Sequence, residues 1–256
     1  MSPRIPDASA LGPKARLGIT AGLAGAAVAG AAIFQGQYPT AQLYGRTIHR
    51  EPGAGKALAL TYDDGPNPVE TPKLLDLLDS YDAKATFFLI GKWAEREPEL
   101  IRETVARGHA IGNHTFTHPS MPAHGAGRIR EELRRCKEAV EASGETFSTV
   151  DGEALMRPPY GRRRPGTLRV LHEEGYVPVT WSITGYDWRE HTTARAITHR
   201  CMKSGKGDIV LLHDGSQDEP AKDRSKSVET TESLLERYAH DGYRFLTVPD
   251  LVAAGS

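Results

Sequence analysis

Cysteine is scarce in this chain, and neither sign of charge is in excess. Two cysteines among 256 residues exclude a disulfide-dense scaffold and a zinc site built from four thiolates. Cys136 and Cys201 are compatible with a bridge, with two free thiols or with two small buried side chains. The 32 basic and 33 acidic residues leave no positive surplus to bind phosphates, so we expect no nucleic-acid partner. A chain of this length has room for one large α/β domain.

Charge is also absent from residues 17–34, LGITAGLAGAAVAGAAIF, which follow several basic residues. That layout is typical of an export signal or of a signal anchor whose N-terminus stays in the cytoplasm. An A-x-A-like cleavage signal indicates a cleaved peptide, whereas the length of the apolar stretch favours an uncleaved membrane helix. We therefore expect residues 1–35 to be a signal peptide or signal anchor, residues 36–55 a stalk or lead-in, and residues 56–256 the folded domain. The protein would be exported, and then either secreted or held at the extracellular face of the cytoplasmic membrane.

Short apolar runs alternate with helix-like segments along the rest of the chain. This alternation predicts about seven parallel strands joined by helices in a barrel-like or doubly wound sheet, and we find no internal repeat. The expected strands are Ala57–Tyr62, Ala85–Ile90, His109–Gly112, Leu155–Arg157, Val177–Ile183, Asp208–Leu212 and Arg244–Val248. The expected helices are Val69–Ser80, Glu95–Arg107, Arg128–Ala142, Thr167–Glu174, Ala194–Met202 and Val228–His240.

Polar side chains follow the carboxyl ends of five of these strands. In parallel α/β folds, active sites assemble at that edge, because the strand ends fix positions while the loops carry the chemistry. We therefore expect the five segments to meet at one site. Their polar residues are Asp63 and Asp64, His114 and His118, Arg157, Asp187, and His213.

Two of these segments have the composition of a metal site. His114 and His118 are four residues apart, so on a helical turn both imidazoles can face one cation. One carboxylate of the pair Asp63 and Asp64 would complete a site with open positions, and the other could take a proton from water. His213 is then the candidate proton donor to a leaving group. The alternative is an ordinary Asp-rich turn beside two solvated histidines.

Five short motifs follow one another along the chain: TYDDGP at 61–66, HTFTH at 114–118, RPPYG at 157–161, the YDW end of WSITGYDW at 181–188, and LLH at 211–213. Taken in that order, they resemble the motifs of the polysaccharide deacetylases of carbohydrate esterase family 4, the NodB-homology domain. The resemblance spans roughly residues 56–250. It implies a distorted (β/α) barrel with fewer strands than a TIM barrel, and metal-dependent removal of acetyl groups from amino sugars.

The resemblance also implies a role for each catalytic residue. Asp63 corresponds to the general base, and Arg157 to the residue that orients it and favours its ionised form. His213 corresponds to the general acid, and Asp187 to the partner that raises its pKa. The backbone N–H of Tyr160 would help to stabilise the tetrahedral oxyanion.

The other matching positions concern the metal and the substrate. The implied ion is divalent, with Zn²⁺ as the first expectation and Co²⁺, Ni²⁺ or Fe²⁺ as alternatives. Its ligands correspond to Asp64, His114 and His118. The substrate pocket corresponds to Trp188, Leu211 and Pro159.

The sequence departs from the family pattern in places. Tyr62 stands where phenylalanine is frequent and adds a hydroxyl that needs a partner. Ser182 and Thr184 occupy a segment where an acidic residue is common, and Met156 stands where an aromatic residue is common. None of these changes removes a candidate ligand, base or acid.

We therefore expect a monomeric hydrolase that releases acetate from N-acetylglucosamine-containing polysaccharide, either peptidoglycan or a chitin-like oligosaccharide. Three alternatives stay open. The same chemistry would cleave O-acetyl esters of xylan or a similar glycan. The protein could instead be a membrane-tethered glycan-binding protein without catalysis. Two histidines and one carboxylate also suit a non-haem Fe(II) oxygenase, although Asp63 and RPPYG then have no evident function.

The segment after His213 is rich in charge. Residues 216–227, SQDEPAKDRSKS, predict an exposed connection, with a part in substrate recognition as the alternative.

Overall fold

The computed structural model describes Gly30 and residues 36–256 of the chain. Apart from Gly30, the apolar stretch 17–34 lies outside the described residues, and so does the helix expected there. Among Gly30 and residues 36–256, no helix combines the length and the apolar character that crossing a membrane requires.

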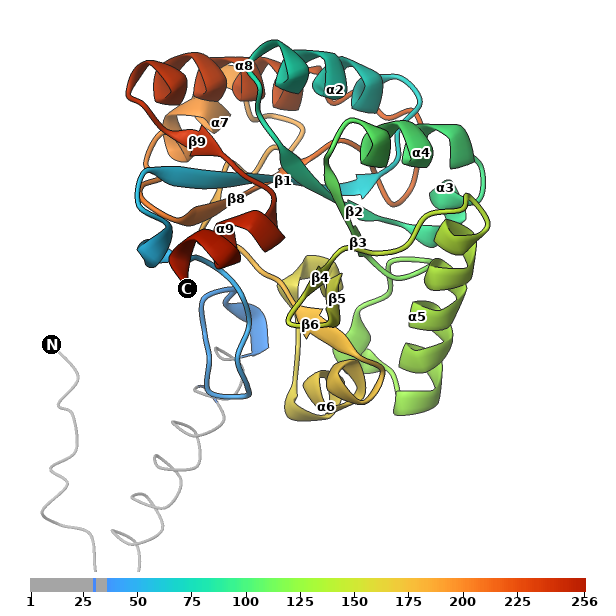
Figure 1. Cartoon of the computed structure of the whole chain (residues 1–256). Helices are drawn as coiled ribbons and strands as arrows, with labels where there is room; N and C mark the ends of the chain where they lie inside the picture. Colours follow the sequence, from blue (N-terminus) through green and yellow to red (C-terminus); the bar gives the residue numbers. More distant parts are fainter. Residues whose placement is uncertain (1–29, 31–35) are drawn as a thin grey trace, which may run out of the picture.

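A mostly parallel sheet with helices around it forms the folded part of the chain, which confirms the predicted α/β class (Figure 1). The strands run in the order β4-β5-β3-β2-β1-β8-β7, with β6 paired to β5 and β9 paired to β1. Their bounds are β1 (Ala57–Gly65), β2 (Ala85–Leu89), β3 (Ala110–Asn113), β4 (Thr149–Val150), β5 (Glu153–Met156), β6 (Tyr176–Pro178), β7 (Ile183–Thr184), β8 (Asp208–His213) and β9 (Arg244–Phe245). The helices are α2 (Glu70–Ser80), α3 (Gly91–Ala94), α4 (Pro98–Ala106), α5 (Ala126–Glu141), α6 (Pro165–Glu173), α7 (Ala194–Cys201), α8 (Ser225–His240) and α9 (Val248–Gly255), and the 3-10 turns are η2 (Pro52–Ala54), η3 (Met121–Ala123) and η4 (Pro159–Gly161).

The expectation of about seven parallel strands needs correction in three places. The sheet has nine strands within the described residues, and the short strand β4 is antiparallel to β5. The run expected at 177–183 divides into β6 and β7, which pair with different neighbours. The run expected at 244–248 ends at Phe245, because the Thr247 hydroxyl accepts the N–H of Asp250 and so caps α9.

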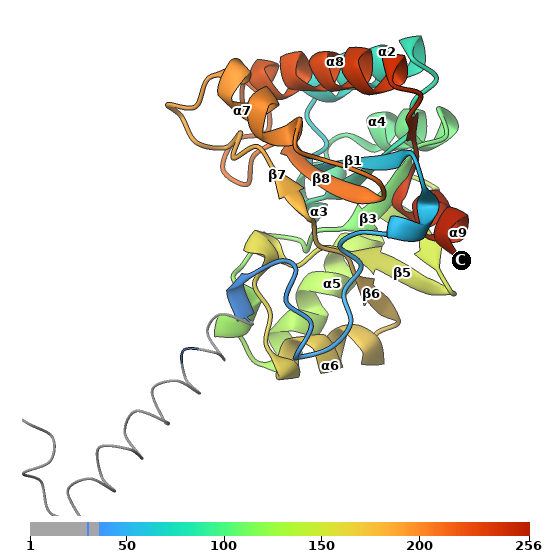
Figure 2. The same cartoon turned by 90° about the vertical axis from the view of Figure 1, so that its left-hand side faces the viewer.

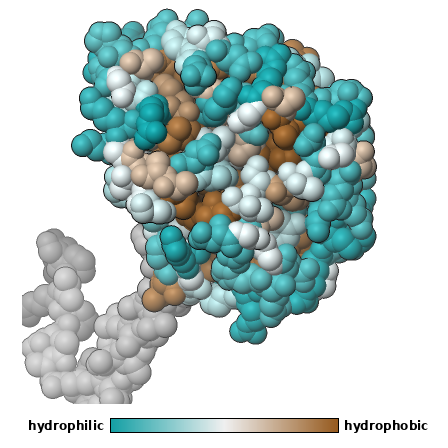
Figure 3. Space-filling model, in the orientation of Figure 1, coloured by the Kyte–Doolittle hydropathy of each residue, from teal (hydrophilic) through white to brown (hydrophobic). Residues whose placement is uncertain are grey.

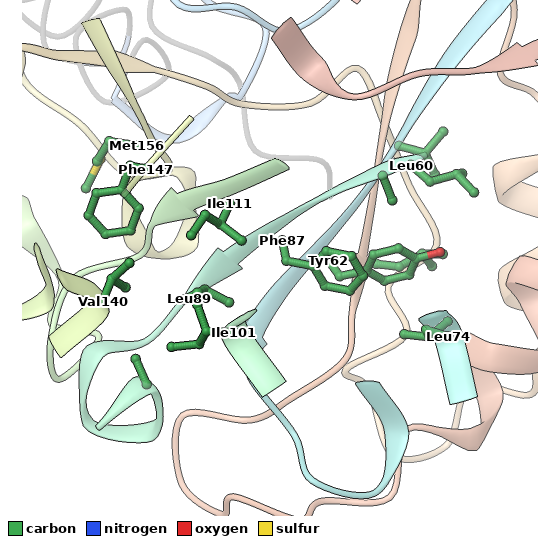
Figure 4. Packing of buried hydrophobic residues seen from close by; sticks show 14 of the residues in the cluster. Leu60, Tyr62, Leu74, Phe87, Leu89, Ile101, Ile111, Val140, Phe147 and Met156 are labelled. Carbon is green, nitrogen blue, oxygen red and sulfur yellow. The ribbon is translucent and has the colours of Figure 1, made fainter. Parts of the chain in front are cut away.

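Alternation along β1 separates two buried layers. Leu58, Leu60 and Tyr62 belong to the cluster between the sheet and the outer helices. Figure 4 shows Tyr62 and Phe87 within this layer, where their stacked rings lie 5.0 Å apart. Each such large apolar side chain contributes about 1.5–3 kcal/mol by leaving water. Hydrophilic side chains cover the helices at the periphery of the molecule (Figure 3).

The opposite face of β1 points into the interior that the sheet encloses. Ala57 and Ala59 pack there with Leu251, a residue of α9. Helix α9 also contacts η2 and β4. Because strand side chains alternate, Thr61 and Asp63 continue the same inward row toward the carboxyl end of β1. The interior is therefore apolar where α9 packs and polar at the edge where the candidate residues lie.

The lead-in, residues 36–55, packs along the domain. It runs past β6 and α6 before it enters β1 (Figure 2). Ile48 forms a parallel bridge with Val179, and Arg50 forms an antiparallel bridge with Asp208. The buried guanidinium of Arg163 donates to four carbonyl oxygens, three of them in the lead-in: those of Tyr38, Pro39, Ala41 and Gly161.

Two smaller expectations are also resolved. Cys136 and Cys201 are buried free thiols and do not form a bridge. The extra hydroxyl of Tyr62 lies 2.9 Å from Oγ1 of Thr231 in α8, which supplies the partner that the buried group needs.

Candidate active site

The five polar segments meet at the carboxyl edge of the sheet, around a cavity of about 760 Å³. Strand register produces much of this arrangement, because Asp63 of β1 is the direct neighbour of His213 of β8. His114 follows β3 and Arg157 follows β5, whose ends pair through Asn113 and Met156. Asp63, His114 and His213 thus line one hollow although they are far apart in the sequence, whereas Arg157 is fully buried and does not line it.

Asp64, His114 and His118 form a buried group whose ligand atoms all lie within 4.8 Å of one another. Oδ1 of Asp64 lies 3.5 Å from Nε2 of His114 and 3.4 Å from Nε2 of His118. Among the described residues, this buried oxygen has no hydrogen-bond partner. A tetrahedral ion with metal–ligand bonds of about 2.1 Å separates its ligand atoms by about 3.4 Å. The three residues therefore fit a divalent cation, which would satisfy the otherwise unpaired carboxylate oxygen.

The protonation state of His114 also suits binding of a cation. Burial lowers its pKa to about 3, and the nearby His118 contributes in the same direction. Nδ1 of His114 lies 2.7 Å from the carbonyl oxygen of Arg157, which fixes a proton on Nδ1 and leaves Nε2 free. The neutral ring can therefore present a lone pair at Nε2.

The segment between the two histidines is a loop, and not the helical turn on which both imidazoles could face one cation. Thr115 and His118 have left-handed φ angles of 67° and 62°. The N–H of Thr115 bonds to the side chain of Asn113 at 2.7 Å instead of to a helical carbonyl. Pro119 also disfavours a helical conformation at His118. The two imidazoles converge because the loop is folded, with their ring centroids 4.8 Å apart.

Glu132 of α5 holds this loop, although no motif in the sequence indicated such a role. Its buried carboxylate accepts the N–H groups of Phe116 at 3.0 Å and Thr117 at 2.7 Å, and also the Thr117 hydroxyl at 2.8 Å. A signal was present, since the carboxylate interrupts an apolar helix face between Ile129 and Cys136.

Asp63 is paired with Arg157 inside the protein. Nη1 of Arg157 donates to Oδ1 of Asp63 at 2.7 Å and to Oγ1 of Thr61 at 2.8 Å. The guanidinium also lies over the ring of Phe88, 4.1 Å from its centroid, which fixes its plane. Burial raises the pKa of Asp63, while Arg157 and His213 act to lower it. Arg157 therefore favours the ionised form as expected, but burial outweighs it.

His213 is held by Asp187, which follows β7. Oδ1 of Asp187 lies 2.9 Å from Nδ1 of His213, and Oδ2 accepts the His213 N–H and the Ser227 hydroxyl at 2.7 Å each. Burial acts to lower the pKa of His213, but the adjacent Asp187 carboxylate and its hydrogen bond raise it to about 9. The ring is therefore protonated at neutral pH, with Nε2–H directed away from Asp187.

Of the three residues expected to form the substrate pocket, two line the cavity and one does not. Trp188 and Leu211 line the cavity, and the ring of Trp188 meets that of His213 edge to face at 5.2 Å. Tyr160 also lines it, with a left-handed φ of 60° in η4 and its ring 4.6 Å from that of His118. Pro159 is buried in η4 and does not line the cavity.

Comparison with known proteins places these features in a family. The family described as polysaccharide deacetylase matches residues 50–179. A peptidoglycan-N-acetylglucosamine deacetylase of Bacillus cereus is 36% identical over 203 residues, which cover 78% of this chain and 90% of that protein. A chitooligosaccharide deacetylase of Sinorhizobium fredii is 34% identical over 195 residues, which cover 76% of this chain and 89% of that protein.

A solved structure agrees with these matches. It is a crystal structure of a peptidoglycan N-acetylglucosamine deacetylase in complex with 4-naphthalen-1-yl-N-oxidanyl-benzamide, and it superposes with a TM-score of 0.72. The identity is 29%, and the superposition covers 81% of this chain and 92% of that chain. Together with the five ordered motifs, these similarities show that the chain belongs to the polysaccharide deacetylases of carbohydrate esterase family 4.

Proposed function

We propose that this protein is a metal-dependent hydrolase that removes N-acetyl groups from N-acetylglucosamine units of a polysaccharide, either peptidoglycan or a chitin-like oligosaccharide. One observation carries the proposal: a single cavity contains both a candidate metal-ligand group and a carboxylate beside a protonated histidine. The ligand group is Asp64, His114 and His118, the carboxylate is Asp63, and the histidine is His213. The matching relatives are named as deacetylases of such glycans.

Asp64, His114 and His118 would hold the metal ion. One carboxylate and two imidazoles suit Zn²⁺, which we propose as the ion, and the family is metal-dependent. When bound, the ion supplies Lewis-acid activation of water and of the acetyl carbonyl.

The chain's own residues would then move the protons. Asp63 accepts a proton from the water that attacks the acetamide carbon, and Arg157 keeps the carboxylate oriented toward the cavity. The Tyr160 N–H donates to the oxygen that gains negative charge. His213 gives its Nε2 proton to the sugar nitrogen as the carbon–nitrogen bond breaks, yielding acetate and a free amine. Asp187 stabilises the charged imidazole until that transfer.

We further propose that the enzyme acts outside the cytoplasm. The support is the uncharged stretch 17–34 after basic residues, with residues 1–35 as signal peptide or anchor and residues 56–256 as the catalytic domain. N-terminal sequencing of the protein recovered from membranes and from culture medium tests this. Recovery of the whole chain in the cytoplasm would contradict it.

The first experiment measures acetate and free amine released from N-acetylglucosamine oligomers and from peptidoglycan by the full chain. We expect equal amounts of the two products, loss of both on chelation, and recovery with Zn²⁺. Asp63→Asn should bind the metal and lose at least about 100-fold in rate. Asp76→Asn, a change on the exposed side of α2, is the matched control.

Two results would overturn the proposal. Acetate released from acetylated xylan without any amine product would identify an O-acetyl esterase. A folded, metal-loaded protein that binds glycan without releasing acetate would identify a binding protein.

A further inference from the structure

The charged segment after β8 is part of the cavity wall. The sequence predicts an exposed connection at 216–227, but Gln217, Lys222 and Arg224 line the cavity. Its backbone is held from outside the segment, because the Trp93 indole N–H donates to the carbonyl of Ser216 at 2.8 Å. The start of the segment therefore has a fixed position beside the candidate metal ligands.

Neighbouring contacts strengthen this anchoring. Nζ of Lys92 in α3 donates to the Gln217 carbonyl at 2.5 Å. Nε of Arg224 donates to the Gly215 carbonyl at 2.6 Å, which ties the far part of the loop to its beginning. The backbone of Gln217 is thus fixed independently of its side chain.

The side chain of Gln217 joins two parts of the site. Its Oε1 contacts Nδ1 of His118, and the Tyr160 hydroxyl donates to the same oxygen at 2.7 Å. One amide oxygen therefore links a candidate ligand to Tyr160, the residue whose N–H is proposed to stabilise the oxyanion.

The chemistry of imidazole gives this contact a consequence. A neutral histidine that binds a cation through Nε2 must carry its proton on Nδ1, and that proton needs an acceptor. For His114 the acceptor is the backbone carbonyl of Arg157, which no side-chain substitution removes. For His118 the acceptor is a side chain, so its identity can change how well the ring binds.

We propose that Gln217 is a positioning residue for the metal site: its amide oxygen selects the Nδ1–H tautomer of His118 and sets the ring so that Nε2 faces Asp64. The inference rests on the proposed function, because it takes Asp64, His114 and His118 as the ligands. The Tyr160 hydroxyl donates to the same oxygen and so helps to hold Oε1 beside His118.

The test is metal binding by the purified full chain, measured by competition with a chromophoric chelator for Zn²⁺ and by the visible spectrum of bound Co²⁺. Gln217→Leu removes the acceptor, and we expect Zn²⁺ affinity to fall by about 10-fold or more, with an altered Co²⁺ spectrum. Gln217→Glu keeps an acceptor and should retain the wild-type affinity. Tyr160→Phe should weaken binding less than Gln217→Leu.

Controls separate this effect from a general disturbance of the loop. Glu219→Gln, in the same segment, should leave Zn²⁺ affinity unchanged, since that side chain pairs with Lys222 at 3.6 Å and touches no candidate ligand. Thermal unfolding of the metal-free variants checks that each one folds. If Gln217→Leu does not fold, Gln217→Asn applies the same test, because its shorter side chain withdraws the oxygen from His118.

The outcomes distinguish the two proposals. Wild-type affinity and spectrum in folded Gln217→Leu or Gln217→Asn would overturn the positioning role and leave the deacetylase intact. A wild-type protein that binds neither Zn²⁺ nor Co²⁺ would overturn the proposed metal site, and the role of Gln217 with it.

Discussion

Replacing Asp187 with asparagine should move the alkaline limit of activity to lower pH. Burial acts to lower the pKa of His213, but Asp187, with smaller contributions from Asp64 and Asp63, raises it to about 9. Without the Asp187 carboxylate, the pKa should fall toward the ordinary value of about 6.5, a change that corresponds to about 3 kcal/mol. At pH 7.5 the protonated share of His213 should drop from nearly all to about one tenth, so the rate should drop about tenfold.

The assay is the pH dependence of kcat/KM for acetate release between pH 5 and 10. The wild-type rate should stay high until the pH approaches about 9, and that of Asp187→Asn should decline from about pH 6.5. Ser227→Ala is the matched control, because it removes one hydrogen bond that an uncharged hydroxyl donates to Asp187 and leaves the carboxylate in place. An Asp187→Asn enzyme whose alkaline limit stays at the wild-type pH would refute the assignment of His213 as the acid.

The same pair has a consequence for stability. The folded protein raises the pKa of His213, so the stability that its protonation contributes is complete below about pH 6.5 and is lost as the pH rises through about 9. Urea unfolding at pH 6 and pH 9.5 should therefore show a smaller pH effect in Asp187→Asn than in the wild type. Equal pH effects in the two proteins would contradict this linkage.

Three further changes have expected outcomes. Glu132→Ala strands two backbone N–H groups in the 114–118 loop, so it should cost about 2–4 kcal/mol in urea unfolding and weaken Zn²⁺ binding; unchanged binding would argue against its role. Tyr62→Phe loses only the bond to Thr231, so stability should fall by about 1 kcal/mol with activity retained, and a large loss of kcat would contradict this. Arg163→Met leaves three lead-in carbonyls without their cation, so it should lower stability by more than about 3 kcal/mol and expose the lead-in to proteases; wild-type protease resistance would count against it.

The spacing of apolar residues predicted most of the strands and helices, because an element that is buried on one side has apolar residues at regular intervals along the sequence. The strand expected at Asp208–Leu212 and the helix expected at Ala194–Met202 each differ from the structure by one residue at one end. Elements whose bounds depend on pairing with distant strands were harder to predict. The 177–183 run looked like one strand, but its two ends pair with β5 and β8 on different parts of the sheet.

The family, the α/β class and the residue types available for chemistry can be read from the sequence alone, since the motifs lie within a few residues of each strand end. How these residues are held depends on the three-dimensional fold. Asp63 lies beside His213 because β1 and β8 pair in parallel register. The HTFTH segment is a loop held by hydrogen bonds to Glu132, and Gln217 contacts His118. Such contacts join residues up to 150 positions apart, and no local periodicity records them, because they depend on how strands and loops pack in three dimensions.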